Sequence, residues 1–163
     1  MWDTKEVEMM DIEGTSDVFI KTSLGSASKE TDTHYRCKDG AASFNYRVLY
    51  NFMAPALKDH EYTLTVQAWD RDFFASNDLI GEAQIDLKAI FDDVIETGGR
   101  SFQITKKYYE QYLKDVMGKG QPLLDFEDED SFWLPLKGKD ENTGEIKVQG
   151  FVRLSMAVLS KTE

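Results

Sequence analysis

The chain has 163 residues, including three prolines, eleven glycines and one cysteine, and this length suits a single domain. Hydrophobic residues make up 41% of it, which is enough for a buried core and argues against disorder of the whole chain. Thirty acidic against nineteen basic residues give a formal net charge of −11. This balance argues against nucleic acid as a partner and against unassisted binding to anionic lipid, since both need cations that meet phosphates.

Targeting and crosslinking signals give further expectations. No window approaches 18 uninterrupted apolar residues, so we expect no membrane-spanning segment in this sequence. The first residues lack the basic flank and apolar run of a signal peptide. A single cysteine, Cys37, cannot form an internal disulfide, which fits a reducing compartment.

Short segments of alternating polar and apolar residues recur along the chain, each closed by polar or glycine-containing turns. The clearest is 44–52, in which every second residue is aromatic or valine. Alternation of this period, with β-branched and aromatic residues, predicts strands. Several short strands separated by turns favour an all-β antiparallel sandwich. The predicted strands are 18–22, 31–36, 44–52, 62–69, 80–87, 132–136 and 146–159.

One stretch departs from this alternation. Residues 87–95 and 106–117 have apolar side chains at helical spacing. The acidic run 125–130 follows, and it predicts a solvated loop, with a second cation site as the alternative. We therefore expect a partly helical insertion at about 87–131 between two strands of one sandwich, within a single domain spanning 1–163. We also expect the first strand to be truncated, because a loop-like stretch follows Met1 and Trp2 almost at once.

Two groups of aspartates carry the chemistry. Asp11 and Asp17 bracket a turn just before a strand, and Asp70, Asp72 and Asp78 lie in and around a loop between two strands. If both loops lie at one end of the sandwich, five carboxylates converge and repel one another unless a cation is present. Oxygen-only ligands on flexible loops suit calcium better than magnesium or zinc. The alternative is five unrelated turn aspartates that cap their own backbone.

These aspartate loops resemble a known family. The segment 10–21 resembles the first calcium loop and second strand of a C2 domain, and 69–72 with 77–81 resembles its third calcium loop. The resemblance implies an antiparallel eight-stranded C2-type β-sandwich. It also implies calcium coordination by all five aspartates, with Met10 and Arg71 offering backbone carbonyls, and we expect two ions.

A narrower resemblance points to one group of C2 proteins. Segments 2–7, 30–35 and 39–47 resemble a C-terminal-region C2 domain of the ferlins, which are large, tail-anchored proteins with many C2 domains that act in vesicle fusion and membrane repair. This resemblance implies a membrane-docking module of a larger protein, at the cytoplasmic face of membranes. The chain departs from the family at 31–36, where many members carry a lysine-rich strand that binds phosphoinositides.

Apolar residues flank the predicted ligands. Ile12, Phe73 and Phe74 fall at loop tips, where shallow membrane insertion needs exposed apolar side chains. Burying one such side chain is worth roughly 1.5–3 kcal/mol. The resemblance assigns insertion to Ile12 and Phe74, whereas Phe73 has packing under the loop as an equal alternative.

Nothing in the sequence indicates catalysis. His34, His60 and Cys37 lack a recognisable partner nucleophile or ligand, and no phosphate-binding glycine loop or zinc spacing occurs. We expect neither an enzyme nor a small-molecule substrate. Two function classes stay open: a calcium-dependent module that binds anionic phospholipid membranes, and a calcium-independent domain that binds protein partners.

Overall fold

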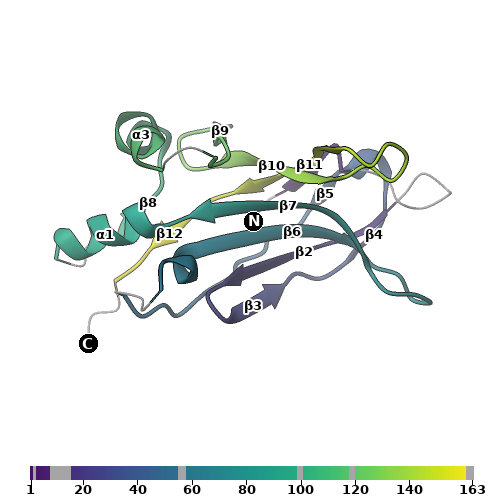
Figure 1. Cartoon of the computed structure of the whole chain (residues 1–163), viewed down its shortest axis with the longest axis horizontal. Coiled ribbons are helices and arrows are strands. Elements are labelled where there is room, and N and C mark those ends of the chain that lie inside the picture. The colour runs from purple at the N-terminus through teal and green to yellow at the C-terminus, as the bar shows by residue number, and fades with distance from the viewer. Residues whose placement is uncertain (2, 8–15, 55–57, 99–100, 118–119, 161–163) are drawn as a thin grey trace.

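A computed structural model gives the structure of the chain and describes residues 1, 3–7, 16–54, 58–98, 101–117 and 120–160. Antiparallel strands dominate it and helices are few (Figure 1), which confirms the predicted all-β class. Within these ranges, no helix is long and apolar enough to cross a membrane.

Twelve strands occur in the described ranges, against eight expected. Four of them have only two residues, too few to produce a recognisable alternation, and eight are longer. The strands are β1 (Asp3–Lys5), β2 (Ser16–Leu24), β3 (Ala27–Glu30), β4 (His34–Cys37), β5 (Ala42–Ser43), β6 (Thr63–Asp70), β7 (Asp78–Asp86), β8 (Phe102–Gln103), β9 (Asp125–Phe126), β10 (Phe132–Lys139), β11 (Ile146–Leu154) and β12 (Ala157–Val158).

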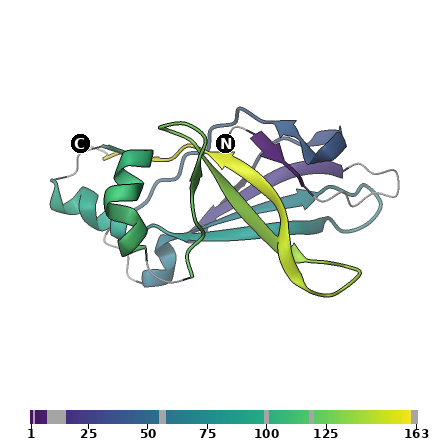
Figure 2. The ribbon, with the colours of Figure 1, turned by 90° about the horizontal axis from the view of Figure 1, so that it is seen from above.

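Ten of these strands form one curled sheet in the order β3-β2-β6-β7-β10-β11-β1-β5, with β4 on β2 and β9 on β10. β7 and β10 share a single register pair, Glu82 with Lys137, so the sheet bends between them. The β10–β11 hairpin therefore crosses obliquely over the other strands (Figure 2). The other half of the sheet joins the two ends of the chain, because β1 pairs with β11 at Thr4 and Val152.

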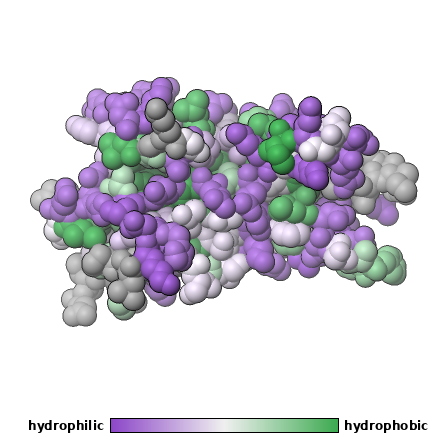
Figure 3. All heavy atoms as spheres, in the orientation of Figure 1, coloured by the Kyte–Doolittle hydropathy of each residue, from purple (hydrophilic) through white to green (hydrophobic). Residues whose placement is uncertain are grey.

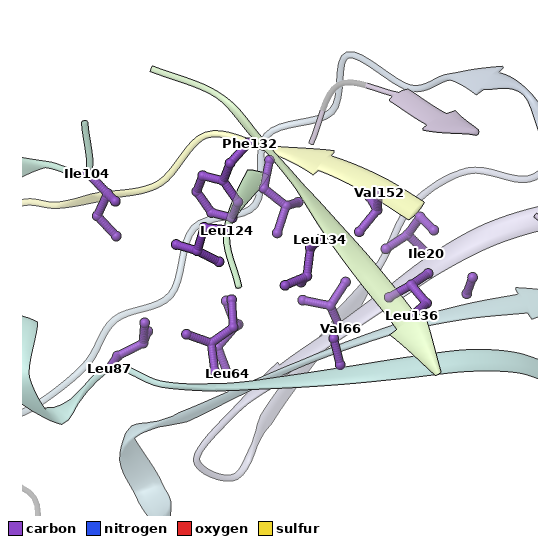
Figure 4. Close-up of a cluster of buried hydrophobic side chains, with 14 of the residues drawn as sticks. Ile20, Leu64, Val66, Leu87, Ile104, Leu124, Phe132, Leu134, Leu136 and Val152 are labelled. Atoms are coloured by element: carbon purple, nitrogen blue, oxygen red, sulfur yellow. The ribbon is translucent and has the colours of Figure 1, made fainter. Parts of the chain in front are cut away.

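The core lies between the two halves of this curled sheet. Ile20 and Val66 from β2 and β6 point toward Leu134, Leu136 and Val152 from β10 and β11 (Figure 4). All five side chains are fully buried. Each contributes roughly 1.5–3 kcal/mol of burial free energy. Because β7 and β10 share only one register pair, this apolar packing holds the two halves of the sheet together.

The predicted insertion is helical where expected. It follows β7 and precedes β10, and it contains α1 (Lys88–Glu96) and a second helix built from α2 (Lys106–Tyr108), a π-helical turn η3 (Tyr109–Leu113) and α3 (Lys114–Val116). Ile90, Ile104 and Leu113 are buried and belong to the same apolar cluster as the sheet. The insertion is thus packed onto the sandwich.

The strand predicted at 44–52 was wrong. The segment has no strand, although its alternation survives as burial: Phe44 is buried, and Tyr50 and Phe52 pack against the core. Asn45 has a φ of 45°, which interrupts the extended backbone. The backbone groups of Tyr46 bond to those of Met1, and the Tyr50 hydroxyl bonds to Thr22, so the segment is attached at separate points.

The elongated fold has two distinct ends (Figures 1 and 2). The helical end carries α1, α2, η3 and α3. The opposite end, which we call the loop end, carries the 71–77 loop between β6 and β7 and the turn of the β10–β11 hairpin, residues 140–145. All of the described residues predicted as ligands or membrane contacts lie at the loop end.

Candidate calcium and membrane site

Three of the predicted ligands lie at the ends of adjacent strands. Asp70 is the last residue of β6 and pairs with Asp78, the first residue of β7. Asp70 also pairs with Val18 of β2, so it lies beside Asp17. A register shift between Ala68 and Trp69 sets this alignment. The strand ladder therefore gathers residues that are 53 and 8 positions apart in the chain.

Asp17 and Asp70 are joined through the backbone. The Asp17 amide donates to Asp70 Oδ1 at 2.7 Å, and the Asp17 carbonyl accepts from the Arg71 amide at 2.9 Å. The Arg36 amide donates to Asp17 Oδ1 at 2.7 Å. Asp70 is only 6% exposed, and a buried carboxylate needs such donors to offset its desolvation. These contacts fix both side chains before any ligand arrives.

Asp72 shapes the loop itself. Its Oδ1 accepts from the amides of Phe74 and Ala75 at 2.8 and 3.2 Å, which is an aspartate turn of the kind weighed as the alternative role. The Asp72 amide donates to Asn77 Oδ1 at 3.0 Å across the loop. Asn77 was not singled out from the sequence, although it closes the loop that carries Phe73 and Phe74.

The Arg71 side chain is held away from the loop tip. Its guanidinium lies 4.2 Å from the centre of the Phe19 ring, and Nε donates to Thr33 Oγ1 at 2.7 Å. An ion pair of 3.3 Å joins it to Glu30. The role expected for Arg71 involves only its backbone carbonyl, which this side-chain arrangement does not block.

The described part of the chain contains no group of three or more histidine, cysteine, aspartate or glutamate side chains that could hold a metal ion. Met10, Asp11 and Ile12 lie outside the described residues. Asp17 and Asp70, with Asp78 on the next strand, supply oxygen donors of the kind that calcium prefers. These donors fit calcium in chemistry, but the described aspartates alone do not form a metal-holding group, and the predicted set also includes Asp11, which lies outside the described residues.

Exposed aromatic side chains project from the same loop. Phe74 is 101% exposed and Phe73 is 68% exposed, so neither is packed under the loop. Phe73 stacks on Tyr35 of β4, with ring centres 5.9 Å apart and planes 11° apart. Tyr35, itself exposed, was missed from the sequence because the contact joins segments 38 residues apart.

Cys37, His34 and His60, for which we expect no function, make contacts within the fold. Burial raises the pKa of the Cys37 thiol, and the charges of Asp17 and Asp70 raise it further. Its Sγ donates to the His34 carbonyl at 3.2 Å, and the His34 ring packs 4.3 Å from that of Phe44. His60 lies in the short 3-10 helix η2 (Asp59–Tyr62).

A shallow cavity of about 400 Å³ lies at the helical end. Its lining combines acidic and apolar side chains from β7, α1 and the second helix. The Tyr108 hydroxyl donates to Asp93 across it, and burial, followed by this contact, raises the pKa of Tyr108. The cavity is remote from the loop end, so it is separate from the aspartate site.

Comparison with known families identifies the fold. The sequence pattern of the C2 domain family matches residues 2–102. The chain belongs to the C2 domain family. This C2 domain is also similar in structure to a C2 domain of plant extended synaptotagmin 1, with a TM-score of 0.58 at 14% identity, covering 99% of this chain and 92% of that one.

Ferlins are among the relatives of this C2 domain. Ferlin 1 of Toxoplasma gondii is 35% identical over 96 residues, and the match covers 56% of this chain. The sperm vesicle fusion protein fer-1 of Caenorhabditis elegans is 26% identical over 115 residues, covering 58% of the chain. In both cases this C2 domain corresponds to 6% of the relative's length. The predicted family resemblance is confirmed.

Proposed function

We propose that this C2 domain is a calcium-dependent phospholipid-binding module of a larger membrane-trafficking or fusion protein. One observation carries the proposal: the strand ends of β2, β6 and β7 bring Asp17, Asp70 and Asp78 to the end from which Phe73 and Phe74 project. Acidic ligands and exposed aromatic side chains at one end are what a cation-controlled membrane contact requires.

The predicted ligands and the exposed apolar residues explain how calcium would control membrane binding. Without a cation, the five predicted ligands Asp11, Asp17, Asp70, Asp72 and Asp78 make the loop end repel an anionic surface. When bound, two calcium ions would reduce this local charge from −5 to about −1 and could accept lipid oxygens as further ligands. Phe74, with Phe73 and Ile12, then enters the headgroup region, and no rearrangement of the sandwich is needed.

The ferlin relatives support the proposed cellular context. One of them is named for sperm vesicle fusion, and each is many times longer than this chain. We place the domain in the C-terminal region of such a protein, at the cytoplasmic face of a membrane to which a tail anchor holds it. We assign it no catalytic activity.

Vesicle sedimentation tests the proposal. Phosphatidylserine-containing vesicles should pellet the domain with calcium and fail to do so with a chelator. Phe74→Ala should weaken this binding by on the order of ten- to hundredfold, because an exposed phenylalanine that enters lipid contributes roughly 1.5–3 kcal/mol. Tyr112→Ala is the matched control, since Tyr112 is an exposed aromatic residue at the helical end. Isothermal titration should show calcium binding without lipid.

Equal sedimentation with and without calcium would overturn the proposal. That outcome would favour the calcium-independent protein-interaction role, with the acidic insertion or a sheet face as the contact. Absence of calcium binding at millimolar concentration would also contradict the assigned ligands.

A further inference from the structure

We propose that the outer face of the β10–β11 hairpin is a second lipid-contacting surface that binds anionic phospholipid headgroups beside the aspartate loops. The surface consists of Lys137, Lys139, Ile146 and Val148, and we call it the hairpin face. This inference rests on the proposed membrane-binding function and adds to it a site outside the calcium loops.

Strand register places these four side chains on one face. Lys137 pairs with Val148 and Lys139 with Ile146 across the antiparallel hairpin. Directly paired residues share a face, and so do residues two apart along a strand. All four side chains are exposed, including Ile146 at 69% and Val148 at 43%. Figure 3 shows hydrophobic atoms among hydrophilic ones over β10 and β11.

The hairpin face is directed outward by a close backbone approach on its other side. A Cβ on Gly138, between the two lysines, would lie 2.1 Å from the carbonyl oxygen of Ile80 on β7. Only glycine permits this contact, so the hairpin presses against β7 through Gly138. Lys137 and Lys139 alternate with it and therefore face solvent.

The lysines of the hairpin face are available for an external anion. Neither Lys137 nor Lys139 forms an ion pair with any residue that the structure describes. Glu82 pairs with Lys137 in register, but its carboxylate oxygens accept from Gln67 and Gln84. The adjoining turn carries Asp140, Glu141 and Glu145, and Asp140 is paired with Lys147. The complementarity to an anionic lipid surface therefore rests on the local face, where two lysines stand beside two exposed apolar side chains.

The hairpin face lies at the same end of the molecule as the predicted calcium loops. Gly138 approaches Ile80, only two residues after Asp78. The hairpin turn and the 71–77 loop extend from the same end in both ribbon views (Figures 1 and 2). A membrane that receives Phe74 therefore lies within reach of the hairpin, and the two contacts together fix how the domain is tilted.

Charge reversal on the hairpin face tests the inference. With saturating calcium and phosphatidylserine–phosphatidylcholine vesicles, Lys137→Glu/Lys139→Glu should lower the affinity by on the order of tenfold or more. Calcium affinity without vesicles and the melting temperature should stay unchanged. Lys107→Glu/Lys114→Glu makes the same charge change on exposed lysines at the helical end and should bind vesicles nearly as wild type does.

A fluorescent probe gives a second readout. Ile146→Cys labelled with an environment-sensitive fluorophore should shift to the blue on calcium-loaded vesicles, whereas labelled Tyr112→Cys should not. Wild-type affinity in the charge-reversed hairpin, or an unshifted probe at position 146 while vesicles are bound, would overturn this inference alone. Failure of the wild type to bind vesicles with calcium would overturn the proposed function, and the inference with it.

Discussion

Asp70 has two roles at the residue scale. It is a predicted calcium ligand, and its Oδ1 also accepts the Asp17 amide inside the β2–β6 ladder. A carboxylate that is 6% exposed costs free energy to bury, so its hydrogen bonds are part of the folded state whether or not an ion is present. Substitutions that separate charge from hydrogen bonding can therefore separate the two roles.

We predict different outcomes for two substitutions of Asp70. Asp70→Asn keeps an acceptor for the Asp17 amide but removes the charge, so it should leave thermal stability nearly unchanged and lower calcium affinity on the order of tenfold or more. Asp70→Ala should also lower the free energy of unfolding by about 1–3 kcal/mol, because the buried amide loses its partner. Calorimetry and denaturant unfolding measure these effects; a destabilised Asp70→Asn would show that the charge itself supports the fold.

Part of the candidate site was predictable from single residues. Asp17, Asp70 and Asp78 stand next to alternating segments, and strand ends are where loop ligands gather. Asn77 and Tyr35 were not predictable, because their roles depend on loop closure and on stacking between β4 and the 71–77 loop. The orientation of the Arg71 guanidinium depends likewise on Phe19 and Thr33, from other parts of the chain.

At the scale of elements, the helical insertion behaves as part of the domain. Leu113 of η3 is 1% exposed and belongs to the main apolar cluster, whereas its neighbour Tyr112 is 59% exposed. The π-helical turn widens the helix by one residue per turn, and such turns are rare. Packing in the core, more than helix propensity, should hold this segment.

We predict that Leu113→Ala lowers the free energy of unfolding by about 2–5 kcal/mol, as expected for a leucine deleted from a packed core. Tyr112→Ala should change it by at most about 1.5 kcal/mol, because Tyr112 is 59% exposed and loses only a ring contact with Tyr108 at 5.6 Å. Chemical denaturation of both variants measures the difference. Equal stabilities would mean that the insertion unfolds independently of the sandwich.

The elements differ in how well the sequence predicts them. Strands β2, β6, β7, β10 and β11 and both helical segments lie where their periodicity indicated. The segment 44–52 failed because alternation reports which side chains are buried, not whether the backbone finds a partner strand. β5, β8 and β12 are set by partners distant in the chain, and β9 pairs with the neighbouring β10; with two residues each, all four are too short to leave a local pattern.

At the scale of the whole molecule, charge controls where lipid can approach. The chain carries −11 in total, so an anionic membrane repels most of its surface. The loop end is the exception in the proposed mechanism, since bound cations and the hairpin lysines lie there together. The helical end then points away from the bilayer and stays accessible.

We predict that vesicle binding with saturating calcium weakens as sodium chloride rises, without vanishing. Screening shortens the range of charge interactions from about 10 Å at 0.1 M to about 3 Å at 1 M salt. Insertion of Phe73 and Phe74 is apolar and should persist. Binding measured over this salt range should therefore decline toward a plateau, and binding that is independent of salt would contradict the electrostatic part of the mechanism.

The pairing of β1 with β11 has a consequence for how the chain acquires its structure. Thr4 and Val152 meet across almost the full sequence, so this contact closes one of the longest loops possible in the chain. Topologies with such distant contacts fold slowly, because loop-closure entropy is lost before the contact forms. During synthesis, β1 must wait for β11 to leave the ribosome, and until then the edge that β1 will cover is absent. β1 can pair early with β5, Asp3 with Ser43 and Thr4 with Ala42, but its other edge stays unpaired until β11 is made. An unpaired strand edge is a site of misfolding and chaperone binding, so the nascent domain carries this exposed edge for most of its translation.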